Sequence, residues 1–321
     1  MKMLEEQDIL KMSQIFTPEN AARFERLHSE RIKLAHYTSA ENAISIIKNR
    51  EIWLRNARAM DDFSEVRYGY DQLKQYFDAG NNTQNFFDAL GGGNSAIKDG
   101  VDKFNSWWGN THGSTYIACF SEHHIKDDEH GRLSMWRGFS QSKPGVAMIF
   151  NPPQPNSALP LKVFLSPVAY YSIKELTLSL DNVVNQIQYH RKYLLQFPSQ
   201  LITDWIYLLL VTAAVSLKHP GFREEEEWRM IHLPDQIPSN FMNPSTESVR
   251  SVPQIVYKIK LKNDPSQNID AIEIANIMDS IIIGPTQYPL SIAGAINHEL
   301  LGIGVQNSQS FIKFSGIPLR S

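Results

Sequence analysis

The sequence predicts an α+β fold, in which strands and helices share a core without regular alternation. Hydrophobic types make up 42% of the 321 residues, enough for a large core without disulfides or a metal. Strand-like and helix-like segments lack the βαβ order of a doubly wound sheet. No Pro/Gly/Ser-rich linker divides the chain, so we expect a helical extension over residues 1–31 and a single domain over residues 32–321.

The first fifth of the chain alternates between the two kinds of element. Pro18 lies near the start of an amphipathic pattern, and Ser39 precedes another apolar stripe as a helix N-cap would. We expect helices over 18–31 and 40–50, strands over 32–37 and 51–54, and a polar loop over 55–65.

The rest of the chain contains helical patterns first and then mostly strand patterns. Helical patterns fill 66–108, and two long helices are expected on either side of Pro198, over 173–197 and 199–217. β-branched and aromatic content predicts strands over 114–121, 145–150, 161–171, 226–232, 254–261, 270–274 and 280–283. A helix over 289–301 and strands over 303–307 and 310–314 complete the prediction.

The composition limits the compartment and the partners. The formal net charge of -3 argues against a protein that coats nucleic acid by charge alone. A single cysteine, Cys119, and an acidic N-terminus favour a reducing, cytoplasmic location without a signal peptide. The apolar run Trp205–Leu217 is shorter than the ~20 residues of a membrane span, so we expect a buried helix.

Two segments could carry acid–base or ligand chemistry. His36, at the exit of a strand, could donate to a ligand hydroxyl, or it could merely satisfy a local carbonyl. If residues 225–229 continue one strand, Glu225, Glu227 and Arg229 share a face. Two adjacent carboxylates repel, and Arg229 could compensate them. The alternative is an exposed edge strand whose charges prevent aggregation.

A third segment pairs a small hydroxyl residue with an aromatic and a cation. Ser121 ends a strand, and Trp136 and Arg137 follow in MWRGF. Together they could flank a planar or anionic ligand, because the planar guanidinium group of arginine binds phosphate with two parallel hydrogen bonds. Alternatively, Trp136 belongs to the core and Arg137 to the surface.

Metal and thiol chemistry find little support. The loop with His123, His124, Asp127, Asp128 and His130 has metal-ligating residue types, but its spacing fits no metal motif, and we expect no metal site. Cys119 lies in an apolar strand, a poor setting for a catalytic thiol.

The ordered motifs resemble the bacterial domain-of-unknown-function family 2971 over about residues 34 to 315. They are HYTSAENAISIIKNREIWL, MDDFSE, CFSE, MWRGF, GVAMIF, FREEEEWR and IIIGP. The family commonly has Asn-Asp-Pro where this chain has Asp61-Asp62-Phe63, and a tyrosine where Phe139 stands.

That family in turn resembles ADP-ribosyltransferases, including toxins that modify nucleic acid. The resemblance implies a split mixed β-sheet with helical insertions. It makes His36 the donor to the adenosine ribose of NAD, Glu227 the catalytic glutamate and Glu225 its partner toward the acceptor. The expected NAD-binding residues are His36, Tyr37, Thr38, Arg55, Ser121, Trp136 and Arg137.

The resulting expectation is transfer of ADP-ribose from NAD to a macromolecule, with RNA favoured over protein. The resemblance also implies a toxin of anti-phage defence with an antitoxin or chaperone partner, and no membrane. The alternatives are a non-catalytic nucleotide- or protein-binding module and a metal-dependent hydrolase or nuclease.

Overall fold

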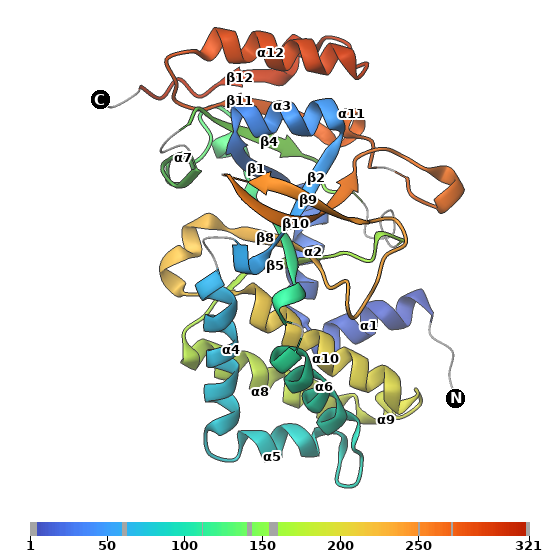
Figure 1. Ribbon diagram of the computed structural model, residues 1–321. Helices are drawn as coiled ribbons and strands as arrows, with labels where there is room; N and C mark the ends of the chain where they lie inside the picture. The colour runs from blue at the N-terminus through green and yellow to red at the C-terminus, as the bar shows by residue number, and fades with distance from the viewer. Residues whose placement is uncertain are drawn as a thin grey trace. The chain divides into compact units, whose positions relative to one another are not determined.

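The computed structural model describes residues 5–59, 63–110, 112–139, 143–153, 160–249, 251–270 and 272–318 (Figure 1). The chain groups into two compact units, each assembled from three separate stretches. Unit 1 comprises Met1–Arg26, Ala57–Thr115 and Ser166–Arg223, and unit 2 comprises Leu27–Asn56, Tyr116–Leu165 and Glu224–Ser321.

These units do not follow the predicted boundary between residues 31 and 32. The chain passes back and forth between them, and no crossing is marked by a linker composition. The helical extension therefore groups with later helices, not by itself. A single catalytic domain over residues 32–321 stays a prediction.

Unit 1 is built from helices around one apolar helix. α10 (Ser199–Ser216) contacts α4 (Phe63–Asp78) and α6 (Ala96–Asn110). Among the described residues α10 is long and apolar enough to cross a membrane, but 61% of it is buried inside the protein. The predicted buried helix is thus confirmed. The unit also contains α1 (Glu6–Phe16), α5 (Asn82–Phe87), α8 (Ile173–Tyr189), α9 (Arg191–Leu194), β6 (Ala169–Tyr170) and β7 (Leu217–Lys218). The helix α2 (Pro18–Ser29) belongs to this unit as far as Arg26.

The crossing of α4 and α10 depends on a glycine. A Cβ atom at Gly69 would lie 2.3 Å from the carbonyl oxygen of Ala214, and a helix backbone cannot move aside cheaply. We expect Gly69→Ala to lower the free energy of unfolding by about 1–3 kcal/mol, measured by urea denaturation. Gly92→Ala is the matched control, because a Cβ there meets nothing within 4 Å.

Unit 2 contains a mixed sheet ordered β12–β11–β4–β1–β3–β2–β10–β9, with β8 paired to β3. β11 and β12 are parallel, and the other registered pairs are antiparallel. The strands are β1 (Lys33–Ser39), β2 (Glu51–Asn56), β3 (Tyr116–His123), β4 (Gly145–Phe150), β8 (Glu227–His232), β9 (Pro244–Val249), β10 (Val252–Lys260), β11 (Met278–Ile283) and β12 (Ile312–Phe314). β5 (Phe164–Pro167), where the chain leaves this unit, also pairs with β8.

The sheet splits along one edge of β3. β8 pairs with β3 over residues 116–121, β1 pairs with it over 121–123, and β2 over 116–117. A strand has two edges, so β1 and β2 must share the edge opposite β8. Within the described strands, neither β1 nor β2 is registered as paired with residues 118–120 of β3 on this edge. The pairing of β1 with β3 ends at Ala35, so the two strands diverge from that point.

Three helices support the sheet of unit 2. α3 (Ala40–Asn49) contacts β1, β2 and β4, and α12 (Pro289–Gly302) contacts α3 (Figure 1). Ser39 caps α3 as predicted, accepting a hydrogen bond from the backbone N–H of Asn42 at 3.2 Å. On the other side, α7 (Leu133–Phe139) adds Met135 and Trp136 to a buried cluster with β1, β4 and β11.

Several predicted elements are wrong in detail. The predicted strand over 161–171 is divided into β5 and β6, and the helix over 173–197 ends at Tyr189. No strand occupies the described part of 270–274, where a short helix (Ile274–Ile277) begins, nor 303–307. β9, with the polar sequence PSTESV, escaped prediction because its pairing with β10 rather than its composition makes it a strand. Residues 60–62 of MDDFSE lie outside the described residues.

Candidate functional site

The three strands of the predicted site lie side by side in unit 2. Ala35 of β1 pairs with Ser121 of β3, which pairs with Glu227 of β8. Residues directly opposite each other in neighbouring strands point to the same face. Ser121 and Glu227 therefore share one face with Tyr37, two residues beyond Ala35. This is the face that α7 covers, because Ala35, Tyr37 and Trp136 belong to one buried cluster.

His36 points to the opposite face. It alternates with Ala35 and Tyr37, and its ring lies 5.4 Å from that of Phe120. Its Nδ1 atom is 2.9 Å from the carbonyl oxygen of Cys119, on the edge where β1 leaves β3. Burial lowers the pKa of His36. His36 and Glu227 therefore lie on opposite faces of the sheet, and His36 contacts a backbone carbonyl at the split.

Glu227 forms a buried ion pair with Arg229. Arg229 Nε donates to Glu227 Oε1 at 2.8 Å, and its Nη2 donates to Oε2 at 3.2 Å. The two residues are 4% and 0% exposed. The predicted compensation of Glu227 by Arg229 on one strand face is thus confirmed. The fork fixes the orientation of the carboxylate, as charged bidentate contacts do.

Glu225 does not belong to this strand. It ends a 3-10 helix (Pro220–Glu225), and Glu226 follows with φ 44°, in the left-handed region. The alternation of β8 starts only at Glu227, so the predicted Glu225/Glu227 strand face is wrong. The backbone of Glu226 instead continues the pairing of β8 with β3, because its carbonyl oxygen accepts a hydrogen bond from the N–H of Glu122 at 2.9 Å.

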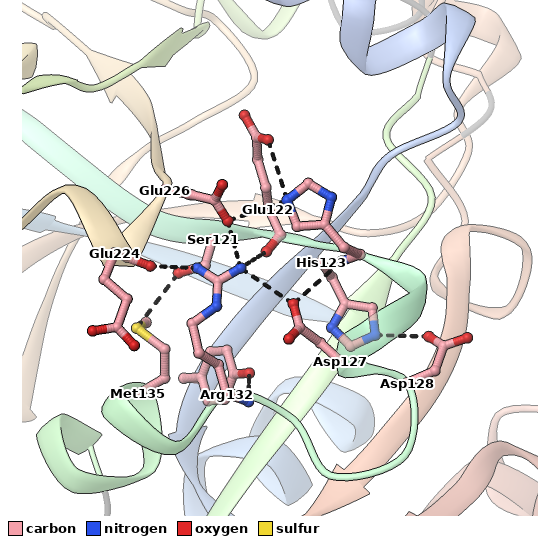
Figure 2. A network of polar contacts seen from close by, with 11 residues as sticks. Ser121, Glu122, His123, Asp127, Asp128, Arg132, Met135, Glu224 and Glu226 are labelled. Atoms are coloured by element: carbon pink, nitrogen blue, oxygen red, sulfur yellow. Dashed lines mark hydrogen bonds and ion pairs between the residues drawn. The ribbon is translucent and has the colours of Figure 1, made fainter.

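Arg132, which was not predicted, ties together the segments around this strand start (Figure 2). Its Nη2 donates to Glu226 at 2.6 Å, to Asp127 at 3.2 Å and to the carbonyl of Glu122 at 2.9 Å. Its Nη1 donates to the carbonyl of Glu224 at 2.6 Å. Arg132 is 9% exposed, so these partners replace most of its hydration.

Tyr37 completes this network by its hydroxyl group. The backbone N–H of Arg132 donates to Tyr37 Oη at 2.9 Å, and the ring packs edge-on against Trp136 with centroids 4.9 Å apart. Burial raises the pKa of Tyr37. The aromatic pair therefore positions α7 against β1, which confirms Trp136 as a core residue.

Removing the Tyr37 hydroxyl tests this contact. We expect Tyr37→Phe to lower the free energy of unfolding by about 1–3 kcal/mol, because a buried N–H loses its acceptor. Urea denaturation measures the loss. Tyr288→Phe is the control, since Tyr288 is 63% exposed. Equal stability of the two variants would contradict a buried hydrogen bond at Tyr37.

The other predicted ligand residues are dispersed in unit 2. Thr38 Oγ1 accepts from Asn42 at 3.2 Å, and Arg55 Nε lies 3.4 Å from Gln254 Oε1. Ser121 is buried and donates to Met135 Sδ at 3.8 Å, on the same face as Glu227. Arg137 is exposed on α7. Phe139 ends α7, but its side chain lies outside the described residues.

Three side chains with metal-ligating atoms lie close together, and only His124 among them belongs to the loop considered above. Glu122, His124 and Glu226 each offer a ligand atom, and these atoms lie within 4.8 Å of one another. Such groups suit zinc. However, Glu226 Oε2 already contacts Arg132 at 2.6 Å and His124 Nε2 at 3.1 Å. The guanidinium would repel a divalent cation at that oxygen.

Residues 135–230 match the model of a family described as a protein of unknown function (DUF2971). The match covers less than a third of the chain and includes MWRGF, GVAMIF and FREEEEWR, which supports the predicted resemblance there. No curated protein and no solved structure matches the chain.

Proposed function

We propose that this protein transfers ADP-ribose from NAD to a macromolecular acceptor, with Glu227 as the carboxylate at the reacting ribose. The observation that carries the proposal is the split of the sheet beside the row Ala35–Ser121–Glu227. Where two strands diverge, their backbone edges can offer donors and acceptors to a planar amide such as nicotinamide. Such an edge is open to groups from both faces of a sheet. NAD at the split could therefore meet His36 from one face and Glu227 from the other.

The chemistry explains why a fixed carboxylate is needed. The N-glycosidic bond of NAD breaks, its electron pair leaves with nicotinamide, and positive charge grows on the ribose. A carboxylate held in place stabilises this oxocarbenium-like state more than the ground state. The acceptor then bonds to the ribose carbon and loses a proton. Glu225 is proposed to orient or deprotonate it, which requires access across the turn at Glu226.

Glu227 must also become accessible to NAD. Because it is 4% exposed and paired with Arg229, binding has to displace neighbouring side chains. Tyr37, Thr38, Arg55, Ser121, Trp136 and Arg137 remain the proposed surroundings of NAD. Tyr37 and Trp136 contribute by packing, and the exposed Arg137 by charge on the pyrophosphate.

The biological setting follows from the family resemblance. We propose a cytoplasmic toxin of anti-phage defence that acts on RNA in preference to protein and has an antitoxin or chaperone partner. The test incubates the parent chain with NAD labelled in its adenine moiety and with separated RNA, DNA and protein fractions. Label is expected in RNA. Label in none of the three fractions would overturn transfer.

The alternative, metal-dependent hydrolysis, would have to use Glu122, His124 and Glu226, whose ligand atoms converge, but the Arg132 guanidinium at Glu226 disfavours a divalent cation there. The two candidates respond oppositely to the same reagents. Transfer requires NAD and survives EDTA, whereas hydrolysis of RNA or DNA by a metal enzyme needs no NAD and stops with EDTA.

A further inference from the structure

Unit 1 contains a cavity that the proposed function does not use. Its volume is ≈ 70 Å³, and its wall consists of residues from the end of α1, the start of α2, β5, β6, α8 and α10. A water needs roughly 10–15 Å³ of such volume, and an engineered cavity of about 150 Å³ holds benzene. The space in unit 1 therefore suits a molecule of a few non-hydrogen atoms.

The wall of this cavity is mostly apolar. Leu176, Leu180 and Val183 project from α8, and Leu209 from α10. Phe16, the last residue of α1, closes another side. This lining favours a ligand with an aliphatic body, which gains from leaving water.

One buried hydroxyl group in the wall has no protein partner. Ser216, the last residue of α10, is 3% exposed, and its Oγ atom makes no hydrogen bond within the described residues. Buried polar groups are nearly always satisfied, so an unpaired hydroxyl in a cavity wall indicates a ligand that hydrogen-bonds to it.

The remaining polar wall suits a neutral rather than a charged ligand. Glu19, at the start of α2, accepts a hydrogen bond from the Tyr171 hydroxyl group. Burial raises the pKa of Glu19, although hydrogen bonding by Ser179 and the charge of Arg23 oppose the shift. Glu19 is thus already hydrogen-bonded within the protein, whereas the neutral hydroxyl group of Ser216 has no partner in the described part of the chain.

We propose that this cavity binds a small neutral molecule with a short aliphatic body and a hydroxyl head that hydrogen-bonds to Ser216. The aliphatic body lies against the leucines of α8 and α10. This ligand site belongs to unit 1, whereas the residues proposed for NAD belong to unit 2. The proposed binding of this ligand can therefore be tested independently of ADP-ribose transfer.

Isobutanol is the probe, titrated into the full-length chain and followed by methyl NMR. The methyl groups of Leu180 and Val183 are expected to shift saturably, with a Kd in the millimolar range for a ligand of this size. Ser216→Ala is expected to weaken isobutanol binding about tenfold, because it removes the hydrogen-bonding partner.

Two further arms separate ligand binding from loss of the fold. Xenon, which needs no hydrogen bond, is expected to shift the same methyl groups equally in the parent and in Ser216→Ala. Ala213→Phe places a large ring on the cavity wall and is expected to abolish both responses while the amide spectrum stays dispersed. No saturable shift with isobutanol in the parent, or equal affinity in Ser216→Ala, would overturn the proposal.

Discussion

Glu227→Gln is expected to reduce ADP-ribose transfer by at least about a hundredfold. The amide keeps the shape of the side chain but carries no charge to stabilise the developing cation, and one such electrostatic contact contributes about 10²–10³ to the rate. The rate is measured as label incorporated from NAD. Glu224→Gln, at an exposed side chain in the same segment, is the control and should transfer at the parent rate.

Loss of stability must be separated from loss of chemistry in this variant. The neutral amide weakens the ion pair with the buried Arg229, and losing a charged contact of this kind costs about 1–3 kcal/mol. The double variant Glu227→Gln/Arg229→Met removes both charges and is expected to recover much of that loss. Urea denaturation checks this recovery. A double variant that regains stability and transfers at the parent rate would remove Glu227 from the mechanism.

Arg132→Met is expected to cause the largest loss of stability among single changes near the site. The guanidinium donates to Glu226, to Asp127 and to two backbone carbonyls, and its loss leaves these acceptors without a cation. Breaking such a buried network costs about 3–5 kcal/mol. The free energy of unfolding is measured by urea denaturation.

Arg137→Met provides the matched control for Arg132. It makes the same chemical change on α7, but at an exposed side chain, and should change stability by less than about 0.5 kcal/mol. Equal effects of the two substitutions would contradict the role of Arg132 as the centre of the network.

Local patterns predicted those parts of the site that depend on one strand. The contact between Glu227 and Arg229 follows from alternation, and the cap at Ser39 from its position before an apolar stripe. Glu225 was misplaced because the left-handed turn at Glu226 interrupts the alternation. A non-glycine residue at positive φ has no clear sequence signal.

The parts that depend on pairing between distant segments could not be predicted. The face of His36 is decided by the register of β1 with β3 and β4. Arg132 was missed because its partners come from β1, β3 and the start of β8, and nothing around Gly131-Arg132 in the sequence indicates them. The grouping into two units depends in the same way on contacts across long separations, not on linker composition.

Release of nicotinamide from NAD tests the proposed activity most directly, since it reports cleavage of the N-glycosidic bond itself. The purified chain is incubated with NAD, RNA and EDTA, and free nicotinamide is measured by chromatography. Time-dependent release by the parent chain, lost in the stable Glu227→Gln/Arg229→Met variant, is the expected result. No release above the enzyme-free blank, or equal release by that variant, would contradict NAD chemistry at Glu227.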